Sequence, residues 1–326
     1  MPLSQIDRLV GVLAKGRRHL IGLSLLRILL GVASIMFYVS DYSRREFLWG
    51  PNSYDSQSLA ARPMGGGLFS LYLLSKSQIW FELVFHAGLL TAILFTIFGG
   101  RALTILQAVF IWSIYNRNQD ILEGGDNLAR ILIIFMIFAV TNAYLAPGAR
   151  RRRERLTARA GTLPIAVHNL SVYLIVFQIC VLYFVAGYSK ITGTVWQDGV
   201  ALYYISRDPA FSSSGLWSSL MSQPFLGTAV AYITIIIEIA FPFAVLSRRA
   251  IIRKAEIFLI EGMHFGIIAF MGLVCFGTIM LAADFAVLRD EDFLTMRRVA
   301  LTMFAAAQSR TRWAQAAEPL VLERVS

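Results

Sequence analysis

A small set of ionisable side chains lies inside long apolar stretches of this sequence, where a charge is costly in a lipid core. They are Arg27, Glu82, His86, Arg130, Glu238, Glu261, His264 and Asp284. Arg27, Glu238 and His264 come closest to mid-depth, so we expect an arginine–glutamate pair with a histidine beside it. Such a cluster would be either an ion pair that holds helices together or a site that handles protons or faces a substrate.

Two pairs among these residues have spacings that place both members on one face of a helix. Glu82 and His86 are four residues apart, and Glu261 and His264 are three apart. Each pair can therefore make a direct contact. The second pair is a weak signal for a metal, because a zinc centre needs further ligands and the sequence has neither an HExxH motif nor paired cysteines. We expect no metal site.

A second group of candidates follows one of the apolar stretches. Lys190 stands just beyond that stretch, and a lysine in a partly dry site can act as a base or bind an anion. Trp196, Asp198, Tyr203 and Tyr204 follow within one short segment. The aromatic residues among them are equally typical of the belt that anchors membrane proteins at the lipid–water interface. We expect this segment to line a cavity that faces outward.

Asp126 is a third kind of candidate, because it follows two glycines and precedes another apolar stretch. Two glycines before an acid suit a tight turn at the start of a helix, with Asp126 as the helix N-cap. That structural role is sufficient to explain the pattern. The outward position of Asp126 also places it on the wall of the expected cavity.

The composition identifies the elements that must position these residues. Apolar residues make up 57% of the 326 residues, charged residues 15%, and the mean hydropathy is +0.62. Soluble proteins carry roughly 45–50% apolar and about 25% charged residues. The sequence therefore predicts an all-α, polytopic bundle of transmembrane helices.

Seven apolar stretches are candidates for spans. They are 20–40, 77–98, 102–115, 127–145, 166–187, 226–246 and 255–288. The last stretch would be about 51 Å long as one straight helix, whereas the hydrocarbon core is roughly 30 Å thick. We expect it to fold near Gly272 into two spans, which gives about eight spans; one span plus a buried helix would give seven.

The basic residues are distributed unevenly between the two sides of this predicted bundle. The side with both termini carries 21 Lys and Arg, and the other side carries 7. The positive-inside rule therefore predicts a cell membrane protein with both termini in the cytoplasm. The net charge of +10 and the arginine run at 150–159 then mark topology, and we expect no nucleic-acid partner. Residues 1–19 and 289–326 are predicted as cytoplasmic, amphipathic flanks of a membrane domain at 20–288.

One string of residues resembles a known family. Gly187-Tyr188-Ser189-Lys190, continued by Trp196 through Tyr204, resembles the signature of the horizontally transferred transmembrane (HTTM) domain, which is shared with vitamin K-dependent gamma-carboxylase. Within that superfamily, the chain most resembles the sporulation-delaying protein B family. The other similar stretches are Arg27 through Gly31, Gly124 through Asp126, Trp196 through Pro209, Glu238 with Arg253, and His264 through Met280. Together they cover roughly residues 20–288.

The resemblance implies an integral membrane factor that acts with a small partner protein to mature a precursor peptide into an exported antimicrobial peptide. In the carboxylase branch, the lysine at the similar place to Lys190 acts as a base in a quinol-driven reaction, and His264 resembles a histidine on a later helix. The candidate catalytic residues are thus Lys190, His264 and Glu238. The candidate cavity residues are Arg27, Asp126, Trp196, Asp198, Tyr203, Tyr204 and Glu261.

Three functions compete on this evidence. Peptide maturation at an outward cavity is the leading hypothesis, with the bilayer and the precursor peptide as partners. A quinol-dependent enzyme of the gamma-carboxylase type is the first alternative. A peptide transporter or immunity protein is the second, and the sequence shows no paired broken helices or inverted repeat of the kind that transporters contain.

Overall fold

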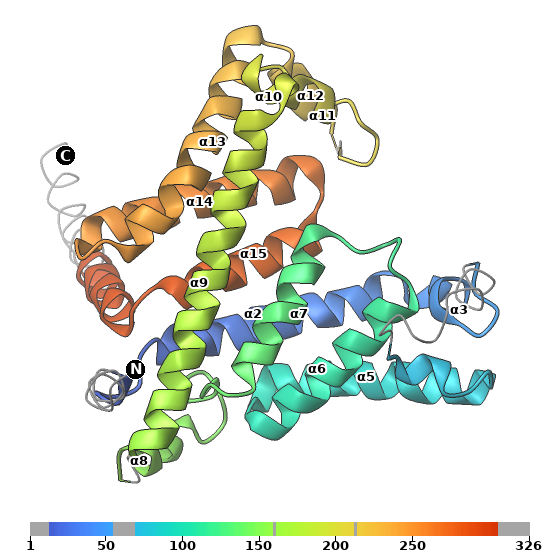
Figure 1. The fold of residues 1–326 in the computed structure, drawn as a ribbon, viewed down its shortest axis with the longest axis vertical. Coiled ribbons are helices and arrows are strands. Elements are labelled where there is room, and N and C mark those ends of the chain that lie inside the picture. Colours follow the sequence, from blue (N-terminus) through green and yellow to red (C-terminus); the bar gives the residue numbers. More distant parts are fainter. Residues whose placement is uncertain (1–12, 55–68, 159–160, 212–213, 306–326) are drawn as a thin grey trace, which may run out of the picture.

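The computed structural model describes residues 13–54, 69–158, 161–211 and 214–305, and in these ranges it contains helices and no strand (Figure 1). This confirms the all-α fold class. The eight principal helices are α2 (Leu20–Ser40), α5 (Gln78–Phe98), α6 (Arg101–Arg117), α7 (Gly124–Met136), α9 (Thr162–Thr192), α13 (Pro224–Leu246), α14 (Ala250–Gly266) and α15 (Val274–Val287). Short helices connect them: η1 (Tyr42–Arg44), α3 (Arg45–Trp49), η2 (Leu71–Leu73), α8 (Ala149–Ala158), α10 (Thr194–Gln197), α11 (Ala201–Ile205) and α12 (Gly215–Met221).

Within the described residues, four helices are long and apolar enough to cross a membrane, namely α2, α5, α9 and α13. With 31 residues, α9 extends about 46 Å and exceeds the hydrocarbon core, so part of it must tilt or project beyond the lipid. The apolar helix α15 has only 14 residues. The chain therefore has the character of a membrane protein, with spans of unequal length.

The predicted span at 127–145 is too long, because α7 ends at Met136. The chain then leaves the helix, and its carbonyl groups are bound by arginines from elsewhere. Arg152 donates to the carbonyl of Asn142, and Arg153 donates to that of Ala143. These contacts satisfy backbone groups that a continued helix would have paired internally.

The long stretch at 255–288 does fold near Gly272, as the sequence predicts. A π-helical turn at Ile267–Met271 ends the first helix, and Gly272 adopts a left-handed conformation with φ of 73°. Glycine suits this position because it has no side chain to clash there. α14 and α15 are consequently two separate helices that meet at this turn.

The core is built around α2, which packs between α15 and α5 (Figure 1). Gly22 lets the backbones of α2 and α15 approach closely, since a Cβ there would lie 2.6 Å from the carbonyl oxygen of Phe285. Gly31 has the same role against Thr96 of α5. On the other side of the molecule, α9 packs along α13. Close packing at small residues is typical of helices in lipid, where packing replaces much of the hydrophobic driving force.

The basic segments gather on one side of the molecule, which we call the basic face. It comprises residues 13–19, α8, the turn between α13 and α14, and residues 289–305, of which 290–305 are helical (Figure 1). α3, α10 and α12 lie on the opposite side, which we call the outer face. This arrangement agrees with the two-sided charge distribution, while the cytoplasmic location of the basic face stays a prediction. Most of the predicted flanks, at 1–12 and 306–326, fall outside the described residues.

Candidate functional site

An ion pair joins the outer end of α9 to the middle of α13. The Nζ of Lys190 lies 2.7 Å from both carboxylate oxygens of Glu238, and the two side chains are 19% and 7% exposed. Trp196, from α10, covers the pair with its ring centroid 5.2 Å from Nζ, a distance at which a cation attracts an aromatic face. We call Lys190 and Glu238, together with the covering Trp196, the outer ion pair. Its two charged side chains are largely shielded from water.

Local sequence explains why the two helices meet here. Gly187 lies one turn before Lys190 on α9, and a Cβ at Gly187 would come within 3.1 Å of the Glu238 side chain. The missing side chain therefore leaves room for α13 to approach α9. The sequence predicts Lys190, Glu238 and Trp196 as site residues, and the structure brings all three together.

A second polar cluster lies deeper in the same helix group. The hydroxyl of Tyr183 is 2.8 Å from Nε2 of His264 and 2.8 and 2.9 Å from the two carboxylate oxygens of Asp284. The hydroxyl has one proton, which it donates to Asp284, so it accepts from an Nε2–H of His264. Nδ1 of His264 then has no partner among the described residues.

Glu261 completes this cluster, which we call the buried network. It lies one turn before His264 on α14, as its spacing predicts, and it is 8% exposed. Neither of its carboxylate oxygens has a hydrogen-bond partner in the described part of the chain. Asp284, on α15, is fully buried. A polar side chain left without partners in a dry interior is energetically costly, so its presence points to a role beyond packing.

α9 links the outer ion pair to the buried network. Tyr183 and Lys190 are seven residues apart, which puts them on the same face about 10 Å from each other along the axis. The ring of Phe241, one turn beyond Glu238 on α13, packs against Tyr183 with centroids 4.1 Å apart. Two polar sites therefore lie at different depths along one helix face.

The expected pairing of Arg27 with Glu238 and His264 is wrong. The guanidinium of Arg27 instead donates to backbone carbonyls of Phe95, Thr96, Thr141 and Leu145. Phe95 and Thr96 lie in the last turn of α5, where the carbonyl of Phe95 also accepts from the N–H of Gly99. The other two carbonyls lie beyond the end of α7. Arg27 thus joins two chain segments near the basic face and lies outside the site.

Asp126 is not the helix N-cap. Glu123 occupies that position, and Asp126 is the third residue of α7 in a reciprocal capping box. Asp126 accepts from the backbone N–H of Glu123 at 2.8 Å and from the hydroxyl of Tyr115 at 2.7 Å. Burial raises the pKa of the Glu123 carboxyl, and the nearby Asp126 adds to this effect. Asp126 is therefore engaged in holding the start of α7.

The remaining cavity candidates lie at the surface. The side chains of Asp198, Tyr203 and Tyr204 are exposed. Tyr203 packs beneath the guanidinium of Arg207, 3.6 Å from the ring centroid. No contact described in the structure joins these three side chains to the outer ion pair, and the chain turns at Gly199, where φ is 72°.

Sequence reasoning missed the importance of Tyr183 and Asp284. Asp284 was one of several intramembrane charges, and only its contact with Tyr183 distinguishes it. Tyr183 lies seven residues, or about two helical turns, before Lys190. This spacing places both residues on one helix face and could have marked Tyr183 as a candidate site residue. By contrast, the predicted contact between Glu82 and His86 is confirmed, with 3.4 Å between Oε2 and Nδ1.

Comparisons with known proteins leave the chain without assigned relatives. No family model, curated protein or solved structure matches it. Among the described residues, no group of three or more His, Cys, Asp or Glu side chains is arranged to hold a metal ion. The function must therefore be argued from the site itself.

Proposed function

We propose that this protein is an integral membrane factor for producing or maturing an exported antimicrobial peptide, and that it acts at its outer face. The observation that carries the proposal is the convergence of Lys190, Glu238 and His264. These residues come from three separate stretches that resemble the sporulation-delaying protein B family, and they lie on adjacent helices α9, α13 and α14. Sequence similarity at scattered positions gains weight when the positions lie on helices that pack together.

The outer ion pair supplies the chemistry for recognising a peptide. A carboxylate of the peptide can replace Glu238 at the ammonium of Lys190, while an amine of the peptide can bind the carboxylate of Glu238. Trp196 offers an aromatic face to the same ligand. Because the pair is only partly exposed, these interactions occur in a medium of low dielectric, where they are stronger than in water.

The buried network supplies groups that exchange protons. His264 and Asp284 share the hydroxyl of Tyr183, and the unpartnered carboxyl of Glu261 lies one turn away on α14. A proton released at the outer face has acceptors within the helix group. The proposal includes a small partner protein and a cell membrane location with the basic face in the cytoplasm.

The decisive experiment compares secreted peptides by mass spectrometry. Four strains are needed: one that lacks the protein, one with the wild type, and one each with Lys190→Ala and His264→Ala. We expect a peptide mass that is absent without the protein, present with the wild type and at least tenfold less abundant with either variant. Lys76→Ala is the matched control, because Lys76 is an exposed lysine outside the site.

The proposal fails if the secreted peptide masses are the same with and without the protein. It also fails if Lys76→Ala lowers the peptide as much as Lys190→Ala does. Immunoblots of membrane fractions must show equal amounts of each variant. This check separates a loss of function from a loss of folded protein.

One observation favours a second candidate, a carboxylase-like enzyme that uses a quinol to modify glutamates. A lysine that acts as a base must first give up its proton, and Glu238 lies 2.7 Å from Nζ, where it can accept that proton. Such an enzyme would add the mass of carbon dioxide to glutamates of an exported protein. The same spectra test this, since an enzyme of this type predicts the added mass with the wild type and its absence with Lys190→Ala.

A further inference from the structure

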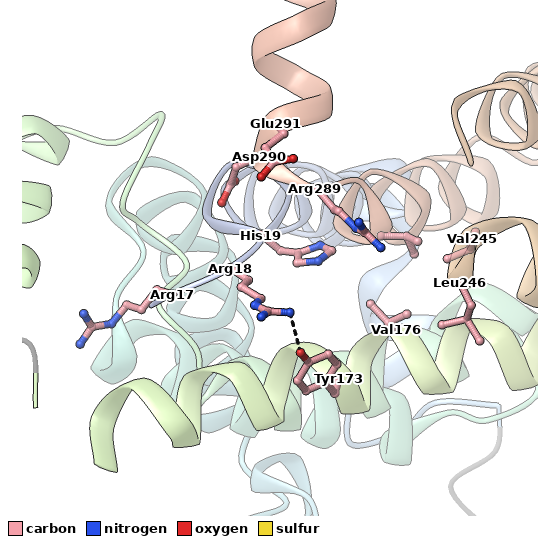
Figure 2. Close-up of a pocket in the computed structure, with 11 residues that line it drawn as sticks. Arg17, Arg18, His19, Tyr173, Val176, Val245, Leu246, Arg289, Asp290 and Glu291 are labelled. Atoms are coloured by element: carbon pink, nitrogen blue, oxygen red, sulfur yellow. Dashed lines mark hydrogen bonds between the residues drawn. The ribbon is translucent and has the colours of Figure 1, made fainter. Parts of the chain in front are cut away.

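A cavity of about 500 Å³ lies at the basic face, away from the candidate site (Figure 2). Its walls come from the segment before α2, the first half of α9, the end of α13 and residues 287–291. These are chain segments far apart in sequence, and they meet where the helices emerge on the basic face. The cavity is polar on one side and apolar on the other.

The polar side carries an excess of positive charge. Arg17, Arg18 and Arg289 line the cavity together with the acidic residues Asp290 and Glu291. The guanidinium groups of Arg18 and Arg289 lie beside the space, whereas that of Arg17 points away from it and donates to the carbonyl of Leu156 on α8 (Figure 2). The carboxylate of Asp290 is already engaged, because it accepts the first two backbone N–H groups of α2 at 3.1 and 2.8 Å. It thereby caps a helix start that lacks a side-chain cap of its own. The cavity is left suited to one further anion.

The arginines retain free hydrogen-bond donors. Arg18 uses one N–H to the hydroxyl of Tyr173 at 2.9 Å, and Arg17 uses one to the carbonyl of Leu156 at 3.1 Å. A guanidinium has five N–H groups, so most of them remain available. Nε of Arg17 is buried and has no partner in the described ranges. Figure 2 shows the side chains of Arg18, His19 and Arg289 around the same space.

His19 adds a neutral donor or acceptor to this side. Its Nδ1 lies 3.0 Å from the carbonyl oxygen of Ala286, which can only accept, so Nδ1 carries the proton. Burial lowers the pKa of the His19 imidazole and favours its neutral form. Nε2 is then an acceptor for a hydroxyl group on a ligand.

The apolar side of the cavity continues into the surface that faces lipid. Val176, Val245 and Leu246 form this wall, and Leu246 is 66% exposed. Exposed phenylalanines extend the apolar surface along the two helices, Phe177 on α9 and Phe243 on α13. A ligand that fits the whole cavity therefore has an anionic head and an apolar tail.

We propose that this cavity binds an anionic glycerophospholipid from the leaflet at the basic face. The phosphodiester lies between Arg18 and Arg289, where guanidinium groups form charge-assisted hydrogen bonds to phosphate oxygens. One acyl chain follows Val176 and Leu246 toward the bilayer. Basic pockets between transmembrane helices on the cytoplasmic side are established sites for anionic headgroups. The bound lipid would tie the start of α2 to α9 and to the segment after α15.

The test measures thermal unfolding of the purified full-length protein in a neutral detergent, titrated with phosphatidylglycerol or phosphatidylcholine. We expect phosphatidylglycerol to raise the unfolding temperature of the wild type at lower concentration than phosphatidylcholine. The double variant R18Q/R289Q should weaken the apparent phosphatidylglycerol affinity roughly thirtyfold, and R289Q alone roughly fivefold. R289Q keeps the test valid if the double variant is unstable, because Arg289 is exposed.

The matched control is R150Q/R151Q, which removes the same charge from exposed positions of α8 on the basic face. It should leave the phosphatidylglycerol affinity within about twofold of wild type. Equal shifts with both lipids would overturn the proposal, as would an R289Q variant that keeps the wild-type affinity. A control that weakens binding as strongly as R18Q/R289Q would show general charge attraction. A shift with inorganic phosphate alone, equal to that with phosphatidylglycerol, would assign the cavity to a free anion.

Discussion

Ionisable side chains are matched differently in the two halves of this molecule. Around α2, α5 and α6, each one named above is matched: Arg27 binds four carbonyl groups, and Glu82 binds Arg45 at 3.0 to 3.2 Å. Around α9, α13 and α14, the carboxyl of Glu261 and the Nδ1 of His264 have no partners among the described residues. The contrast concerns ionisable groups, since the fully buried amide of Gln107 in α6 also has no partner among the described residues. The first half uses its ionisable groups to fix the fold, while the second half keeps some of them unmatched.

The physical basis of this contrast is the cost of a bare polar group in a dry interior. A buried group without a hydrogen bond costs about 1–3 kcal/mol, and charged groups cost more. Such a cost persists in a folded protein when the group acts on something that the structure does not contain. Substitutions in the first half should therefore cost stability, whereas some substitutions in the second half should cost function alone.

The largest effect is expected for Arg27→Met. Methionine fills much of the space of the fully buried Arg27 side chain but removes the guanidinium donor from four backbone carbonyls, of which that of Phe95 keeps the N–H of Gly99. We expect a loss of about 3 kcal/mol or more of unfolding free energy. Thermal unfolding in detergent and the yield of monodisperse protein measure this loss.

Arg151→Met is the matched control for that prediction. Arg151 is an exposed arginine of α8, and its substitution should change stability by no more than about 0.5 kcal/mol. If Arg27→Met unfolds at the same temperature as the wild type, the structural role of Arg27 is contradicted. It would return this residue to the set of site candidates.

Substitutions in the outer ion pair should give the next largest effect. This pair lies in the second half, but its two charges are matched to each other. Lys190→Met leaves Glu238 buried without its cation, and we expect a loss of about 2 kcal/mol. Adding Glu238→Gln should restore most of that loss, because the double variant has no uncompensated charge. Function should stay lost in both variants if the pair contacts the peptide.

A double-mutant cycle measures this coupling in unfolding experiments on wild type, both single variants and the double variant. We expect an interaction free energy above about 1 kcal/mol. Additive effects of the two substitutions would show that the contact contributes nothing. A double variant that regains peptide production would show that the pair is purely structural.

The positions of the long helices could be predicted from the sequence, whereas the residues at which helices end could be predicted less well. Hydropathy located α2, α5, α9 and α13 and the break near Gly272, because lipid imposes length and apolarity on spans. The end of α7 at Met136 was missed. The residues beyond it are apolar enough to continue a helix, and the arginines that bind their carbonyls come from other helices, α2 and α8. Hydropathy carries no information on such contacts.

The same reason limits what the sequence could predict about the site. The sequence singled out Lys190, Glu238 and His264, but the network that surrounds His264 depends on tertiary packing. Asp284 meets Tyr183 only because the chain reverses at Gly272 and brings α15 beside α9. Arg27 was assigned to the wrong partner because a mid-depth estimate along one helix does not say which helix lies next to it.

The smallest effect should have the opposite sign and discriminates most sharply between the two halves. Glu261→Gln replaces a buried carboxyl that has no partner in the described part of the chain with a neutral side chain of nearly the same shape. We expect stability to stay equal or to rise by up to about 1 kcal/mol, because a costly group is removed. Peptide production should nevertheless fall if Glu261 holds a proton for the buried network.

Glu82→Gln provides the matched comparison, since it makes the same chemical change in the other half. There the carboxylate binds Arg45, at side-chain exposures of 27% and 21%, so the change should cost up to about 1 kcal/mol and leave peptide production unchanged. Unfolding temperatures and secreted peptide masses of the two variants, measured side by side, give the test. If Glu261→Gln destabilises the protein as Glu82→Gln does, then Glu261 is an ordinary structural group and the contrast between the halves disappears.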